Sequence, residues 1–295
     1  MSSLLRYSLA PLAYLVLSVL AACLLGYAML GLIGDRLPLD KLIPKLTQLL
    51  LILGLFSLKR RLNLSWRDFG FAPPARFFRQ LSRGLALAFI TLGPVLLCLY
   101  LIGVQEYDAG RVWTPDKLAG KIGLGLLLSL LIAFFEEILF RGLLLASLLR
   151  RLPGPAAVTL SALYFALLHF LKSASKIPYS EITPFTPLQL AGEAFGNWLN
   201  PQILDALPAL FAVGLLLALL RWRYPASLGV CIGCHCGWVW QIKLCKDLWN
   251  LNPHSDYLYL VSQYYDGITG PFVAVWLILA SAALFNLTRR ANPNA

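Results

Sequence analysis

Long apolar stretches recur along the whole chain, and they restrict the folds open to it more than any other feature. A stretch of about twenty apolar residues can cross a hydrocarbon core roughly 30 Å thick as a single helix. The chain is 59% hydrophobic and only 13% charged, which is outside the range of soluble globular domains. We therefore predict an all-α, polytopic membrane helical bundle with about eight transmembrane helices, at residues 8–33, 42–58, 84–104, 118–149, 155–171, 204–221, 225–243 and 272–288.

The whole chain, residues 1–295, is expected to form a single integral membrane domain. The first apolar run is too long for the hydrophobic region of a cleaved signal peptide. Residues 59–83 are polar, basic and aromatic, and this composition is typical of a cytoplasmic interfacial linker. Residues 118–243 contain the helices of the predicted catalytic core.

Two long outer loops are expected at about 172–203 and 244–271. The second contains Tyr257, Tyr259, Tyr264 and Tyr265. Loops of this length are often functional, so both are candidates for gating access or binding substrate. The alternative is an aromatic belt that only anchors the bundle at the membrane interface.

Basic residues are distributed unevenly between the two sides of the predicted bundle. Of the 25 Lys and Arg, 14 lie at the termini and in the loops that follow the second, fourth and sixth predicted spans. Ten lie on the other side, and Arg141 lies within a span. The first side has one acidic residue, Asp68, and the other has eleven. This bias places both termini in the cytoplasm and brings the basic face to anionic lipid headgroups, so no nucleic acid partner is expected.

Three ionisable residues lie inside the apolar stretch 118–149: Glu136, Glu137 and Arg141. Charged groups at that depth are costly unless paired or hydrated, so they mark a candidate functional site. Glu137 and Arg141 are one helical turn apart, the spacing at which a carboxylate and a guanidinium can pair. Such a pair could be purely structural, but Glu136 is rotated by about 100° and remains available for another role.

Two histidines on later spans are expected to reach the same depth. At 1.5 Å per residue, Glu136 and His169 each lie roughly 20 Å, and His235 roughly 15 Å, from the cytoplasmic ends of their helices. A single histidine on an apolar helix is more often a packing residue. Agreement in depth on three helices instead favours one shared site.

An acid and an imidazole in apolar surroundings suit general-base chemistry. They could activate water to attack a peptide carbonyl, while a second imidazole stabilises the oxyanion. This chemistry requires no metal or other cofactor.

These residues resemble a known family. Glu136-Glu137-x-x-x-Arg141, then Phe165-x-x-x-His169, then His235 on a later span, is similar to the CAAX protease and bacteriocin-processing family of glutamic intramembrane proteases, which includes the Ras-converting prenyl endopeptidases. The helix count and the stretch 66–71 before the third span are also similar. The resemblance covers roughly residues 60–243.

The resemblance implies a role for each residue. Glu136 and His169 would activate the water, Glu137 and Arg141 would support the site, and His235 would contribute to the oxyanion hole. The family has an Asn four residues after this last His as a second oxyanion donor, whereas this chain has Val239. Either Gln241 or Trp240 substitutes for it, or activity is weak or lost.

Three other interpretations remain open. Cys231-x-x-Cys234-His235 matches the c-type haem attachment pattern, but it falls within a predicted membrane helix. The same residues, with His169 or Glu136, could bind zinc in a metal-dependent membrane hydrolase. A transporter or scaffold that retains the protease fold is the non-enzymatic alternative.

The sequence thus predicts an intramembrane endopeptidase in a prokaryotic inner membrane. Its expected partner, besides the lipid bilayer, is a membrane-anchored or lipid-modified polypeptide, cut near the non-cytoplasmic surface.

Overall fold

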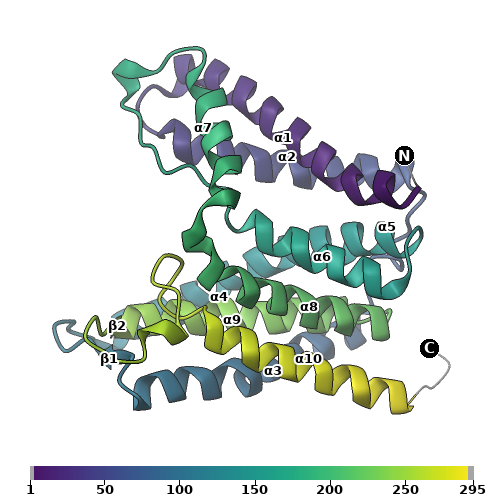
Figure 1. Ribbon diagram of the computed structural model, residues 1–295, viewed down its shortest axis with the longest axis vertical. Coiled ribbons are helices and arrows are strands. Elements are labelled where there is room, and N and C mark those ends of the chain that lie inside the picture. The colour runs from purple at the N-terminus through teal and green to yellow at the C-terminus, as the bar shows by residue number, and fades with distance from the viewer. Residues whose placement is uncertain (1–2, 292–295) are drawn as a thin grey trace.

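The fold is a bundle of long helices, as the computed structural model of residues 3–291 shows (Figure 1). The side chains of Arg289 and Arg290, which enter the charge count above, lie outside the described part. The helices of the bundle are α1 (Ser3–Ile33), α2 (Leu39–Arg61), α3 (Pro74–Leu101), α4 (Pro115–Glu137), η1 (Ile138–Leu144), α5 (Leu145–Leu149), α6 (Gly154–Leu168), α8 (Leu207–Arg223), α9 (Leu228–Leu248) and α10 (Pro271–Ala291).

The predicted all-α membrane class is confirmed. Four helical segments are long and apolar enough to cross a membrane: Leu5–Leu32, Leu39–Arg61, Pro74–Leu101 and Pro115–Leu149. Two shorter helices, Gly154–Leu168 and Pro271–Leu287, are also apolar. The count of eight spans remains a prediction.

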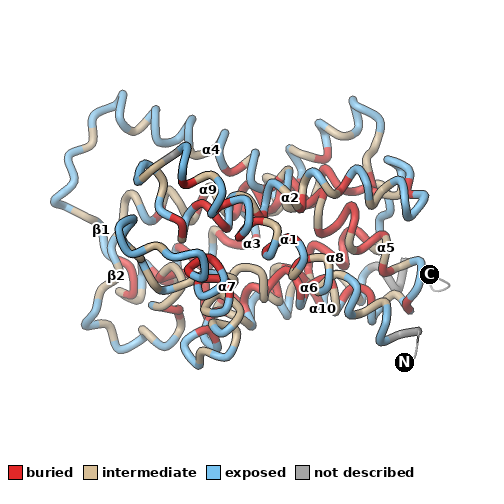
Figure 2. The backbone as a smooth tube through the Cα atoms, turned by 90° about the horizontal axis from the view of Figure 1, so that it is seen from above, coloured by how far each residue is buried: buried red, intermediate tan, exposed pale blue. Residues whose placement is uncertain are grey.

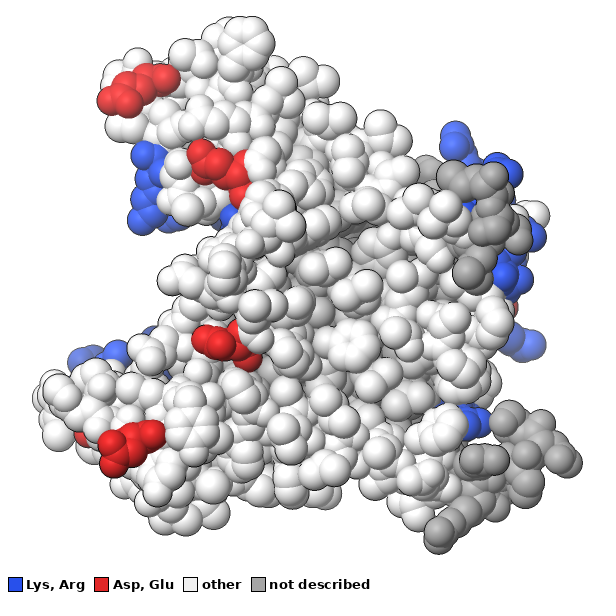
Figure 3. Space-filling view, viewed as in Figure 1, with Lys and Arg blue, Asp and Glu red and all other residues white. Residues whose placement is uncertain are grey.

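The surface of the bundle agrees with a membrane setting. Much of α4 is exposed, as Figure 2 shows, yet its exposed side chains include Leu124, Leu128, Leu131 and Phe135. Figure 3 shows a wide face almost free of charge, with Lys and Arg at the end where α2 and α5 finish, and both Lys or Arg and most of the visible Asp and Glu toward the opposite end. A multi-pass membrane protein explains both features, because lipid tails can cover exposed apolar side chains.

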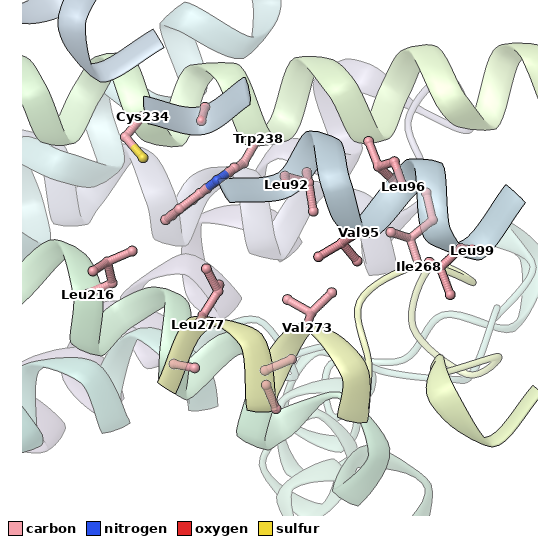
Figure 4. Packing of buried hydrophobic residues seen from close by; sticks show 14 of the residues in the cluster. Leu92, Val95, Leu96, Leu99, Leu216, Cys234, Trp238, Ile268, Val273 and Leu277 are labelled. Carbon is pink, nitrogen blue, oxygen red and sulfur yellow. The ribbon is translucent and has the colours of Figure 1, made fainter. Parts of the chain in front are cut away.

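The largest apolar core lies between α3, α8, α9 and α10 (Figure 4). One threonine, Thr91, accepts hydrogen bonds from two indoles, of which that of Trp238 is buried and that of Trp276 is partly exposed. The indole Nε1 of Trp238 donates to the hydroxyl of Thr91 at 2.8 Å, and Nε1 of Trp276 donates to its carbonyl at 2.7 Å.

Helix α9 packs closely on α3 because glycine recurs every fourth residue along it, at Gly229, Gly233 and Gly237. A Cβ at Gly229 would meet the carbonyl oxygen of Phe77, and one at Gly233 that of Leu81. Small residues at this spacing let two helix backbones approach within a membrane. The pattern fixes the depth and rotation of α9, and therefore of His235.

The connection between α2 and α3 is shorter than the predicted linker. Residues 59–61 end α2 and residues 74–83 begin α3, so only 62–73 connect the two helices. This connection is anchored to α8, where the Arg221 guanidinium donates to the carbonyls of Asp68 (2.5 Å) and Phe69 (3.3 Å). Gly70 has a φ of 90°, and a Cβ there would meet the Arg221 side chain.

Both predicted outer loops contain regular structure. The first holds α7 (Thr186–Gly196) and the 3₁₀ helices η2 (Tyr179–Glu181), η3 (Asn197–Leu199) and η4 (Pro201–Asp205). In the second region α9 continues to Leu248, and β2 (Trp249–Leu251) follows, then the 3₁₀ helix η5 (Leu258–Leu260). Strand β2 pairs antiparallel with β1 (Gln105–Tyr107). This pairing joins the α3–α4 connection to the α9–α10 connection at one end of the bundle.

Candidate active site

A fully buried ion pair lies at the centre of the site. Nη1 of Arg141 is 2.8 Å from Oε1 of Glu137, and neither side chain has any exposed surface. Nη2 of Arg141 donates to the carbonyl of Gly214 on α8 at 3.3 Å, and its guanidinium carbon lies 4.4 Å from the centre of the Phe165 ring. Glu137 and Arg141, which lie one helical turn apart in the sequence, therefore form an ion pair in the structure.

The helix widens immediately after the two acids. Residues Ile138–Leu144 form a π-helix, η1, between α4 and α5. Gly142 lies against the fully buried ring of Phe69, and a Cβ at Gly142 would come within 2.6 Å of that ring. Wide turns of this kind occur frequently at functional sites. The connection 62–73 thus packs directly against the segment that carries Arg141.

His235 joins the ion pair from α9. Its Nδ1 is 2.8 Å from the same Glu137 Oε1, and the ring is 4% exposed. Because an ionised carboxylate only accepts hydrogen bonds, Nδ1–H is the donor. The opposite nitrogen, Nε2, lies 3.9 Å from Oε2 of Glu136. Glu137 thus orients the imidazole so that Nε2 points at the second acid.

Glu136 is the less constrained of the two acids. Its side chain is 30% exposed as a whole, whereas its Oε2 is buried and accepts no hydrogen bond from residues 3–291. The carboxylate also lies within electrostatic range of the His169 imidazole. Glu136 is therefore the acid that a water molecule or a substrate could reach.

His169 is the first residue after α6, and its tautomer is fixed by a backbone group. Its Nδ1 lies 2.7 Å from the carbonyl oxygen of Phe165, which can only accept, so Nδ1 carries the proton. Nε2 is then the basic nitrogen of the neutral ring.

The Phe165 ring lies among the charged groups of the site. Its centre is 4.5 Å from the centre of the His169 ring and 5.8 Å from that of the His235 ring. The structure therefore brings the five predicted site residues together: Arg141, His169 and His235 contact the buried Phe165 ring, and the two acids lie beside His235.

Both residues considered as substitutes for the missing asparagine donate to backbone carbonyls. The single N–H of the Trp240 indole donates to the carbonyl of Ile122 at 3.1 Å. One of the two N–H groups of the Gln241 amide donates to the carbonyl of Gly237 on its own helix at 3.0 Å, and a Cβ at Gly93 of α3 would lie 3.8 Å from the Gln241 Oε1.

The cysteines of α9 do not form a metal site with the histidines. Cys231 Sγ points to the carbonyl of Leu217 on α8, at 3.5 Å. Among the residues that the structure describes, no group of three or more His, Cys, Asp and Glu side chains could hold a metal ion. The arrangement of donors therefore does not support the zinc alternative.

Sequence reasoning did not identify the glycines of α9 as contributors to the site, although they could have been found from their period of four. It named Tyr265 only as one of four tyrosines in an outer loop. The approach of Tyr265 to His169, with 6.4 Å between the ring centres, is a long-range contact that the sequence does not reveal.

Ionisable side chains gathered deep inside an apolar helical bundle mark the functional site of an integral membrane protein. Within this class, residues 118–241 match the family model described as type II CAAX prenyl endopeptidase Rce1-like. The match runs from α4 into α9, and it confirms the resemblance to the CAAX protease and bacteriocin-processing family. This family implies a protease. Neither the curated proteins nor the solved structures contain a match to the chain.

Proposed function

We propose that this protein is a glutamic-type intramembrane endopeptidase that hydrolyses a peptide bond of a membrane-anchored or lipid-modified polypeptide. The observation that carries the proposal is the partly exposed side chain of Glu136, whose buried Oε2 has no hydrogen bond from the described residues and lies 3.9 Å from His235 Nε2, with the His169 ring within electrostatic range. Because backbone bonding makes Nε2 of His169 the basic nitrogen, this group and Glu136 can share the task of deprotonating a water.

The proposed reaction has two steps. Glu136 and His169 take a proton from water, and the resulting hydroxide forms a C–O bond with the scissile carbonyl carbon. The tetrahedral intermediate then collapses, the C–N bond breaks, and the proton passes to the leaving nitrogen.

His235 would donate Nε2–H to the oxyanion. For this it must carry protons on both nitrogens, and the carboxylates of Glu137 and Glu136 stabilise that cation. In this assignment Glu137 and Arg141 position His235.

An apolar cavity beside the site supports a substrate that carries a lipid. The cavity has a volume of about 350 Å³ and lies between α1, α2, η1, α5 and α6. Its walls include Tyr14, Leu51, Leu144, Tyr164 and Leu168. This volume is within the range of pockets that bind small ligands, and Leu168 is adjacent to His169.

The proposed location is a prokaryotic inner membrane with both termini in the cytoplasm. The Lys- and Arg-rich end of the bundle supports this orientation (Figure 3). Protease protection of a C-terminal epitope tag in right-side-out membrane vesicles tests it.

The test of the activity is Glu136→Gln in purified protein reconstituted in liposomes, with a fluorogenic farnesylated CAAX peptide as the substrate. We expect a loss of about 10²–10⁴-fold in turnover, the usual contribution of a general base. Glu106→Gln is the matched control, because it makes the same change at an exposed acid on β1. Cleavage that survives Glu136→Gln unchanged would contradict the assignment.

A non-enzymatic scaffold is the second candidate, favoured by one observation: Val239 cannot donate a hydrogen bond. If the wild-type protein cleaves no peptide although Glu136→Gln and wild type bind it equally, the scaffold would be the better description.

A further inference from the structure

Because Val239 stands where the family has an asparagine, one position of the proposed oxyanion hole has no donor. His235 provides one hydrogen bond, whereas the indole N–H of Trp240 and one N–H of the Gln241 amide, whose Oε1 lies near Gly93 of α3, donate to backbone carbonyls. Loss of a single oxyanion donor costs about 10²–10³-fold in turnover. An active protein of this kind therefore needs a donor from another element.

The segment 252–270, between β2 and α10, brings Tyr265 to the site. The Tyr265 ring contacts His169 and also Phe170, with 5.6 Å between the ring centres in the second pair. It packs in the apolar cluster of Phe170, Ile203, Ala206 and Leu210. Tyr265 thus approaches His169 from the outer end of the bundle, on a segment that the family match, residues 118–241, does not include.

Hydrogen bonds hold this segment in one conformation. Asp266 accepts from the amides of Ile268 (2.9 Å) and Thr269 (2.6 Å). On the other side of Tyr265, the Tyr264 hydroxyl donates to Asn197 Oδ1 at 2.9 Å, which ties the segment to η3. The backbone on both sides of Tyr265 is therefore fixed, and catalytic donors must be held in place in this way.

The hydroxyl of Tyr265 makes no hydrogen bond in the described part of the chain, whereas its amide donates to Ser262 Oγ. Burial raises the pKa of the Tyr265 phenol above its ordinary value, and the charges of Asp266 and Glu136 raise it further. The phenol therefore keeps its proton at neutral pH. A protonated hydroxyl without a hydrogen bond to the described residues, on a ring that packs beside His169, is a donor available to a ligand.

We propose that Tyr265 is a catalytic residue whose hydroxyl donates a hydrogen bond to the oxyanion, in place of the asparagine that Val239 replaces. This proposal rests on the endopeptidase function proposed above. The tyrosine exchanges no proton with the substrate: it binds the negative oxygen while the C–O bond exists and releases it when the C–N bond breaks. The outer segment then completes the site as well as covering it.

The test is Tyr265→Phe, assayed on the farnesylated peptide in liposomes. The substitution keeps the ring that packs on His169 and removes only the hydroxyl. We expect kcat to fall about 10²–10³-fold, KM to stay within threefold, and the thermal unfolding temperature to stay unchanged. Tyr259→Phe is the matched control, because Tyr259 belongs to the same segment and is 68% exposed.

A second variant tests whether Tyr265 acts as a hydrogen-bond donor or only by packing against His169. Val239→Asn, introduced into Tyr265→Phe, restores an amide one helical turn after His235, and we expect it to recover at least tenfold in kcat. A kcat of Tyr265→Phe within threefold of wild type would overturn the proposal. So would a loss that Val239→Asn leaves untouched, because the tyrosine would then act by positioning His169.

The failure of this inference can be distinguished from failure of the proposed function. An inactive wild type, or an active Glu136→Gln, rejects the endopeptidase itself. An active wild type that requires Glu136 but not the Tyr265 hydroxyl rejects only the assignment of Tyr265.

Discussion

Replacement of Arg141 by methionine tests the central ion pair most directly. The substitution keeps an unbranched side chain of similar reach and removes the charge. Glu137 then loses a partner at 2.8 Å in a place where neither side chain is exposed. The carbonyl of Gly214 also loses its donor, and the Phe165 ring loses the guanidinium over its face.

The expected cost follows from the burial of the pair. Removing one member of a fully buried ion pair leaves an uncompensated charge and typically costs about 3–5 kcal/mol. Neutral hydrogen bonds between membrane helices average only about 0.6 kcal/mol, because the unfolded chain in the membrane also finds partners. A loss above about 2 kcal/mol therefore exceeds what the loss of a neutral hydrogen bond would give.

The assay is reversible unfolding of the purified protein in mixed micelles with increasing SDS. We expect Arg141→Met to lower the free energy of unfolding by about 3–5 kcal/mol. The double variant Glu137→Gln/Arg141→Met should be more stable than Arg141→Met alone, since no buried carboxylate then lacks its guanidinium. Arg150→Met is the control: its pair with Asp68 is 3.1 Å long but largely exposed, so about 0–1 kcal/mol is expected.

Two results would refute this reasoning. One is a loss in Arg141→Met no larger than in Arg150→Met. The other is strict additivity of the Glu137 and Arg141 substitutions, which would mean that the two side chains do not stabilise each other.

Three further outcomes are expected. Gly233→Leu should lower the free energy of unfolding by at least about 1–3 kcal/mol, because a side chain there meets the backbone of Leu81. Gly123→Ala, on the open face of α4, should leave the free energy of unfolding unchanged. SDS titration measures both variants, and equal stability would contradict the close packing of α9 on α3. The amide and hydroxyl of Ser65 donate to Asp68 and hold the pKa of its carboxyl below the usual range. The ionised carboxylate therefore stabilises the fold above the usual pKa, and this stabilisation is lost as pH falls through the lowered pKa. Melting temperatures below about pH 4 should drop more in wild type than in Asp68→Asn, and parallel curves would exclude this contribution. Peptide cleavage should persist in EDTA and 1,10-phenanthroline, and zinc-dependent recovery of a chelated, inactive protein would instead support the metal-dependent alternative.

Much of the fold follows from the sequence because membrane burial requires long apolar runs, and these are visible in a single chain. The pairing of Glu137 with Arg141 follows equally from local spacing. The rotation of one helix relative to another does not follow from the sequence. The sequence does not say which His235 nitrogen faces Glu137, and the packing of α9 on α3 is what turns Nδ1 toward that carboxylate. The approach of Tyr265 depends on a long-range contact of an outer segment, which hydropathy does not record.

The wide turn η1 has a consequence for how this helix can vary. An α-helix advances about 100° per residue, whereas a π-turn takes about one more residue to close and so holds an additional residue without changing the phase of the helix after it. Deleting one residue within 138–144 would let the segment rewind as ordinary α-helix, with the acids and the buried face of α5 near their present phase. The residues inside the turn, Arg141 among them, would then shift relative to Glu137. We therefore expect a shortened form of this stretch to keep its fold and to lose its site.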